Sequence, residues 1–145
     1  MAAMSDYLEN KIIDQVFRGQ AFTFPTTLYV GLYSVAPSDT GGGTEVTGNA
    51  YARVSVAASL ANFAGTQGAA STVASSGTTG TTSNNAAITF PTPTASWGSV
   101  VAFGIFDAAS AGNLLFYGTL TISKTINQGD TVTFPASTLS IQIDN

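Results

Sequence analysis

The stretch from Ser96 to Leu120 constrains the fold more than any other part of the sequence. Two apolar runs flank a short, polar, glycine-containing segment, which is the pattern of a β-hairpin. The alternation of side chains along a strand puts three residues of the first run on each face: Val101, Phe103 and Ile105 on one, and Val100, Ala102 and Phe106 on the other. A hairpin that is apolar on both faces needs cover on both, so we place it at the centre of the core.

Most of the remaining chain also reads as short strands. From Phe22 onward, about seven or eight alternating or β-branched runs are separated by Gly, Pro, Asn and Asp turn signals. This spacing predicts a mainly β fold, a single-domain antiparallel β-sandwich of jelly-roll type over residues 1–145. The predicted core consists of large apolar residues of the hairpin and of the last strand: Trp97, Val101, Phe103, Ile105, Leu114, Phe116, Leu139 and Ile141.

A short N-terminal helix is predicted over residues 5–18. Ser5 is a suitable N-cap, and Gly19 is a natural C-terminal stop. Leu8, Ile12 and Val16 recur every four residues and form one apolar stripe. The stripe can pack on its own domain or on a neighbouring subunit, and the sequence leaves both open.

Residues 57–85 are rich in Ala, Ser, Thr and Gly, with Leu60 and Phe63 as large apolar groups. Such a composition buries little surface, so we predict a long flexible loop or an extended arm. The candidate assembly interface combines this segment with the helix stripe: Leu8, Ile12, Val16, Leu60 and Phe63.

The chain carries very little charge. It has 4 basic and 8 acidic residues and a net charge of −4, which argues against nucleic acid as a partner because no basic surface exists to neutralise phosphates. The span from Val54 to Phe106 has no charged residue. A soluble monomer normally keeps a charged surface, so the deficit favours a homo-oligomer, such as a trimer, over a monomer covered by Thr, Ser and Asn.

No targeting feature is predicted. The first ten residues lack the pattern of a secretory signal, and no apolar run approaches the roughly 20 residues that span a bilayer. We therefore expect synthesis in the cytoplasm and no membrane partner.

The sequence offers little for catalysis or cofactor binding. There is no His and no Cys, which removes the commonest general base, the thiol nucleophile and the preferred zinc ligands. Four carboxylates fall in or beside predicted turns, where structural hydrogen bonds are their usual role: Asp39, Glu45, Asp107 and Asp130. We predict no enzyme, no metal and no cofactor. Four strand tyrosines could stack on sugars, although packing on the sheet is the commoner fate: Tyr29, Tyr33, Tyr51 and Tyr117.

Short motifs spread along the chain in a constant order carry a family likeness. They are Tyr7–Ile12, Leu28–Tyr33, Pro37–Gly41 with Thr44–Val46, Ala50–Arg53, Ala95–Gly98, Phe103–Asp107 and Gly112–Leu115. In these segments the chain resembles a family of small tailed-bacteriophage proteins that are variously labelled tail-fibre or decoration proteins. The segment from 57 to 85 departs from the family in its length.

This resemblance implies a virion protein without settling whether it lies on the head or the tail. A compact domain with a charge-poor surface and segments that can reach adjacent subunits suits a head decoration or cement protein. The partner of such a protein is the major capsid protein. The alternative is a tail-fibre or neck component, with tail or neck proteins as partners, or an adhesin that binds a host surface glycan. We expect decoration of the head in preference to the tail.

Overall fold

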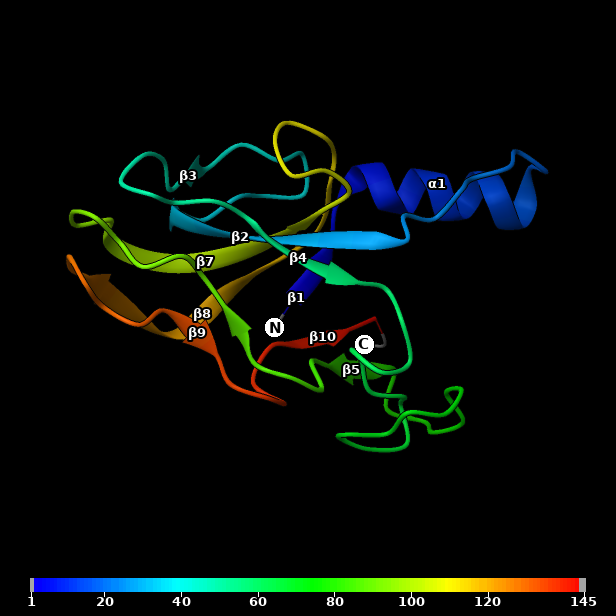
Figure 1. The fold of residues 1–145 in the computed structure, drawn as a ribbon. Coiled ribbons are helices and arrows are strands. Elements are labelled where there is room, and N and C mark those ends of the chain that lie inside the picture. The colour runs from blue at the N-terminus through cyan, green and yellow to red at the C-terminus, as the bar shows by residue number, and fades with distance from the viewer. Residues whose placement is uncertain (1, 144–145) are drawn as a thin grey trace.

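The computed structural model describes residues 2–143, which form one helix and ten strands (Figure 1). In chain order the elements are β1 (Ala2–Met4), α1 (Asp6–Phe17), β2 (Thr27–Val35), β3 (Thr44–Glu45), β4 (Val54–Ala57), β5 (Thr81–Ser83), β6 (Ile88–Thr89), β7 (Gly98–Phe106), β8 (Leu114–Ile126), β9 (Thr133–Phe134) and β10 (Ser140–Gln142).

A six-stranded antiparallel sheet forms the first layer. Its order is β1-β8-β7-β2-β3, and β4 also pairs with β2. The predicted hairpin is present as β7 and β8, and it occupies the middle of this sheet, between β1 and β2.

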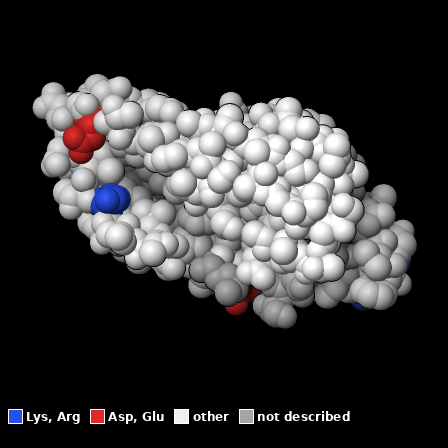
Figure 2. All heavy atoms as spheres, turned by 90° about the horizontal axis from the view of Figure 1, so that it is seen from below, with Lys and Arg blue, Asp and Glu red and all other residues white. Residues whose placement is uncertain are grey.

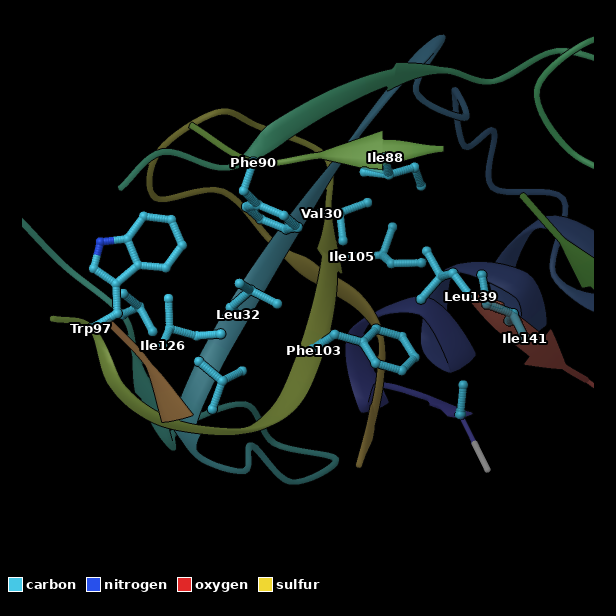
Figure 3. Packing of buried hydrophobic residues seen from close by; sticks show 13 residues of the cluster. Val30, Leu32, Ile88, Phe90, Trp97, Phe103, Ile105, Ile126, Leu139 and Ile141 are labelled. Carbon is cyan, nitrogen blue, oxygen red and sulfur yellow. The ribbon is translucent and has the colours of Figure 1, made fainter. Parts of the chain in front are cut away.

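Two antiparallel ribbons, β5 with β10 and β6 with β9, form the second layer. Side chains of the six-stranded sheet point toward side chains of the second layer, and together they fill the space between the two layers (Figure 3). Val30, Phe103 and Ile105 come from the sheet, and Ile88 and Leu139 from the opposite layer. The predicted class, mainly β and antiparallel with a short N-terminal helix, is therefore confirmed, with a second layer made of short ribbons.

The predicted core residues divide into two groups. Six of them are buried: Trp97, Phe103, Ile105, Leu114, Leu139 and Ile141. Val101 and Phe116 are partly buried and pack against the two buried clusters from outside.

The predicted facing of two hairpin residues was wrong. Val100 belongs to the main cluster with Phe103 and Ile105, while Val101 packs against the smaller cluster around Ala102 and Phe106. The cause is a bulge: the β7–β8 register shifts so that residues 120–123 of β8 lie opposite Val101 alone. A bulge interrupts the strict alternation of side chains between the two faces of a sheet. Because this strand is apolar on both faces, its sequence does not reveal where the alternation breaks.

The helix prediction was accurate, and the loop prediction needs one change. Ser5 is the N-cap and α1 ends at Phe17, so residues 5–18 fold as the sequence indicates. Within the segment predicted as a loop, Thr81–Ser83 form β5 and pair with β10. The partner strand lies almost sixty residues further on, so local composition does not reveal this pairing.

Candidate assembly surfaces

Residues 6–26 project from one end of the sheet as an arm, made of α1 and the segment that returns along it (Figure 1). Its base is firmly attached. The Ser5 backbone N–H donates to the carbonyl oxygen of Leu115 over 2.9 Å, and the Ser5 hydroxyl donates to that of Leu114. Leu8 is only 4% exposed. Leu8 is thus used by the packing of its own chain, which removes it from the predicted assembly interface.

The far half of α1 extends beyond the sheet, so its apolar side chains lack cover. Ile13 is 48% exposed, Val16 64% and Phe17 80%. These three residues are here named the arm tip: Val16 and Phe17 follow Ile13 by three and four positions, so both lie next to it on the helix surface. Ile12 is half-buried. Of the predicted stripe, therefore, Val16 alone is strongly exposed.

The returning segment stiffens the arm. The backbone N–H of Phe22 donates to Oε1 of Gln15 over 2.6 Å, and the ring of Phe22 packs edge-on against Tyr7. At the end of the helix, Arg18 pairs with Asp14 over 3.0 Å. The arm tip is therefore presented on a supported helix.

A groove of about 540 Å³ lies at the other end of the sheet. Its floor includes Leu32 and Val100, and its walls are the second half of β8, from Leu120 to Ile126, and residues 130–134. Ile122, in the bulge, lines the groove and is 68% exposed. Figure 2 shows this charge-poor underside, with a hollow toward its left end and blue and red groups beside it.

The predicted loop lies below the second layer in Figure 1. Leu60 is exposed, whereas Phe63 is half-buried and forms a bridge with Asn84. Between them and β5, polar side chains fold the loop on itself: Gln67 accepts a hydrogen bond from the Ser76 N–H over 3.2 Å and donates to the Ser71 hydroxyl over 2.6 Å. Val73, at 62% exposure, is a second exposed apolar group of this loop beside Leu60.

Charged groups meet in one partly buried network. Arg53 makes a bidentate pair with Glu45, with Nε–Oε1 and Nη2–Oε2 distances of 2.8 and 2.7 Å. Its Nη1 donates to the carbonyl oxygens of Ala108 and Ala111, and its guanidinium lies 3.3 Å from the ring centroid of Phe106. The network ties the turn after β7 to β3 and the residues before β4. Sequence reasoning missed it, because Arg53 and Glu45 are brought together by strand pairing and the two carbonyl partners lie 55 and 58 residues further along the chain.

Tyr51 completes the network. Its hydroxyl donates to Oε1 of Glu45 over 2.9 Å and accepts from the backbone N–H of Leu32 over 2.8 Å. Burial raises the pKa of Tyr51, and the neighbouring carboxylate of Glu45 adds to this effect. Glu45 is therefore fully engaged by Tyr51 and Arg53 as a structural acceptor.

The other three carboxylates named from the sequence also hold turns. Asp107 accepts from the backbone N–H of Asn113, and Asp130 from that of Asn127, each over 2.7 Å. Asp39 accepts a hydrogen bond from the hydroxyl of Tyr117.

These carboxylates do not gather into a centre. Within residues 2–143, no group of three acidic side chains lies close enough to hold a metal ion. In the same part of the chain, no helix has the length and apolarity needed to cross a membrane.

The four tyrosines considered for sugar stacking are occupied in packing. Tyr33 is buried and stacks on Phe106 with ring centroids 6.4 Å apart, and Tyr29 and Tyr117 pack against the same smaller cluster. Tyr51 lies edge-on to Trp97 at 5.3 Å. Exposed large apolar side chains lie elsewhere. Four are on the arm (Ile13, Val16, Phe17 and Phe24), Ile122 is at the groove, and the others are Val35, Leu60, Val73 and Ile143.

Comparison with protein families matches residues 3–142 to the family described as podophage GP4 fiber I protein gp80. The chain belongs to this family. It is thus a structural protein of the tailed-phage virion, as the resemblance implied, and the match covers both the arm and the groove. Comparison with curated proteins gives no match.

Proposed function

We propose that this member of the fibre I family is a non-enzymatic building block of a virion fibre, held in place by apolar contacts with neighbouring virion proteins. The observation that carries the proposal is the uncovered arm tip, with Phe17 at 80% exposure on a helix that projects from the fold. Covering a large apolar side chain that projects from the fold removes apolar surface from water and lowers the free energy. Such a side chain therefore marks a surface that another protein covers.

The distribution of polar chemistry supports a contact role rather than a catalytic one. Arg53 and Glu45 satisfy each other, and the turn carboxylates satisfy backbone N–H groups. None of these groups is free to act as a general base with a matched partner. Glycan binding is not part of the proposal, because the candidate tyrosines pack within the fold.

Head decoration is the second candidate. The charge-free span from Val54 to Phe106 and the loop with exposed Leu60 and Val73 favour it, since a cement protein covers a broad capsid surface through weak contacts repeated many times. In that case the partner is the major capsid protein; in a fibre, it is a tail or fibre protein.

The copy number per virion and the position on the particle distinguish the two. Quantitative mass spectrometry of purified virions, with the major capsid protein as internal standard, gives the copy number, and antibody labelling seen by electron microscopy gives the position. A few dozen copies or fewer at the tail support the fibre proposal. Hundreds of copies over the head support decoration instead, and absence from purified virions contradicts both.

A further inference from the structure

The two points at which the arm joins the body do not by themselves fix its direction. One is Ser5, whose backbone and side chain bond to β8, and the other is Thr26, whose carbonyl oxygen accepts a hydrogen bond from the Ala58 N–H. Two points define an axis about which a projecting element can rotate. The 12 residues of α1 span about 18 Å, so a rotation of about 20° at the base moves the helix end by about 6 Å. A further contact is therefore needed to hold the arm tip in one place.

Asp39 supplies this contact from another part of the sheet. It lies in the loop between β2 and β3, which reaches the base of α1 (Figure 1). The backbone N–H of Asp6, one of the free donors at the start of the helix, donates to the carbonyl oxygen of Asp39 over 3.0 Å. The turn around Asp39 is closed by two backbone hydrogen bonds between Ser38 and Gly41, each 2.9 Å long. The loop thus offers a preformed acceptor to the first turn of α1.

Tyr117 holds Asp39 from the other side. The hydroxyl of Tyr117 donates a hydrogen bond to the carboxylate of Asp39. Tyr117 pairs with Ala3 of β1 on one side and with Gly104 of β7 on the other, so it lies in a part of β8 that is paired along both edges. Its ring packs against the smaller core cluster. Tyr117 is therefore a fixed point of the sheet to which the loop is tied.

We infer that Asp39 is a positioning residue for the arm: held by Tyr117, it sets the direction in which α1 leaves the sheet. A hydrogen bond constrains direction as well as distance, whereas the burial of Leu8, the other contact at the base, is non-directional. The bond from Phe22 to Gln15 lies within the arm and moves with it. This bond stiffens the arm without orienting it.

Repulsion between carboxylates makes the bond to Tyr117 important. The hydrogen bond to Asp39 contributes most to the raised pKa of Tyr117, and the negative charges of Asp6 and Glu9 add to it, so all three carboxylates lie near this hydroxyl. Like charges repel one another, and the Tyr117 hydroxyl is the donor that stabilises Asp39 beside the other two. Without this donor, the turn that carries Asp39 should move away from the first turn of α1.

The direction of the arm tip matters to the virion if the arm tip is a contact surface, and in this respect the role of Asp39 rests on the proposed function. The direction itself is a property of the purified full-length chain and is measured without virions. A failure of the positioning role is therefore distinguishable from a failure of the fibre proposal.

Distances between spin labels test the positioning role, because the chain has no native Cys that would compete for labelling. Val16→Cys places one label on the arm, and Ile122→Cys places the other on the exposed part of β8. Double electron–electron resonance gives the distribution of distances between them. Leu60→Cys with Ile122→Cys is the control pair, because both positions are exposed and neither lies on the arm.

Asp39→Ala and Tyr117→Phe should each widen the 16–122 distribution about two-fold or more, because the helix amplifies a rotation at its base. Combining the two changes should widen it no further, since both remove the same bond. Asp39→Asn keeps an acceptor oxygen for Tyr117 and should remain close to wild type. Asp14→Ala, which removes an exposed ion pair within the arm, is the matched control and should leave the distribution unchanged.

The 60–122 distribution should respond to none of these changes, and circular dichroism verifies that each variant is folded. An unchanged 16–122 distribution in Asp39→Ala and Tyr117→Phe overturns the inference. Widening in Asp39→Asn as large as in Asp39→Ala overturns it as well, because the acceptor oxygen would then not be what holds the arm. Equal widening of the 60–122 distribution also overturns it, since this would indicate a general loosening of the fold.

Discussion

The indole Nε1 of Trp97 donates a hydrogen bond to the carbonyl oxygen of Asn49, 3.0 Å away, across 48 residues of sequence. The side-chain amide of Asn49 returns a bond to the carbonyl oxygen of Ser96 over 3.1 Å. Asn49 and Ala50 have positive φ angles of 50° and 66°, a conformation that L-residues rarely adopt. The beginning of β7 thus holds a strained turn in place.

Replacing Trp97 with Phe should destabilise the fold. The change removes the indole bond to Asn49 and leaves a cavity beside Tyr51, which packs on the indole. We expect a loss of about 1–3 kcal/mol in the free energy of unfolding, measured by urea denaturation. Asn49→Gly is the control: it loses a side-chain bond but relieves the positive φ, so its effect should stay within about 1 kcal/mol. A larger loss for Asn49→Gly than for Trp97→Phe would contradict this account.

Arg53→Lys should be costly although it keeps the charge. Lysine cannot reproduce the bidentate bond to Glu45, the two bonds to the 108 and 111 carbonyl oxygens and the stacking on Phe106. We expect a loss of about 2–3 kcal/mol by urea denaturation. The matched control is Arg18→Lys in the exposed pair with Asp14, where the effect should be below about 0.5 kcal/mol. Similar losses in the free energy of unfolding for the two variants would show that the partly buried network stabilises the fold no more than the exposed ion pair does.

Asn84→Ala should be among the most damaging single changes. The buried side-chain amide of Asn84 donates to the carbonyl oxygens of Ala86 and Pro135, over 2.7 and 2.9 Å, and accepts from the Leu139 N–H over 2.9 Å. Its removal leaves buried backbone groups without partners, so we expect a loss of about 3–5 kcal/mol or failure to fold. Thermal denaturation followed by circular dichroism measures it. Asn10→Ala on the exposed side of α1 is the control and should be neutral or slightly stabilising.

Stability should fall at alkaline pH. The bond to the Asp39 carboxylate raises the pKa of Tyr117 from 10.0 to about 12. Because the folded state keeps the proton to higher pH than the unfolded state, the contribution is complete below pH 10 and is lost as the pH rises toward 12. Burial also raises the pKa of Tyr33 and of Tyr51, which adds to the same decline.

Comparing unfolding in urea at pH 9 and pH 11 tests this expectation, with Tyr117→Phe as the variant. Wild type should lose stability between the two values, and Tyr117→Phe should lose less. An equal loss in the two proteins would mean that the bond to Asp39 does not hold the proton in solution.

Shortening the loop below the second layer tests whether it contacts a virion partner. Replacing residues 68–75 by two glycines removes Val73 but leaves β5 and its pairing with β10 intact. If the loop binds the capsid or another virion protein, incorporation into particles should fall several-fold while the melting temperature of the purified protein changes little. Normal incorporation would remove this loop, though not Leu60, from the candidate contacts.

Local signals in the sequence predicted a good part of the fold. The helix over residues 5–18 follows from the Ser5 cap and the Gly19 stop, and the β7–β8 hairpin follows from two apolar runs around a polar turn. In each case the determining interactions lie within a few residues of one another. The burial of Trp97 and Leu139 follows in the same way from their apolar character in β-type segments.

Interactions between distant segments were not predictable in this way. The bulge of residues 120–123, the β5–β10 pairing and the bonds of Arg53 all depend on which strands become neighbours. The exposure of the residues predicted for the assembly interface was unpredictable for the same reason. Leu8 and Val16 belong to one stripe, yet the sheet ends between them, so one is buried and the other exposed.

The position of the arm and the groove on β8 has a mechanical consequence. A pull applied between Ser5 and the groove acts along the axis of β8, which lies beside β7 over most of its length. Interstrand hydrogen bonds run perpendicular to this axis, so the load shears many of them together instead of opening them one by one. A subunit loaded between its arm and the groove end would therefore transmit force through its most extensively paired strands, while the short ribbons of the second layer carry little of it.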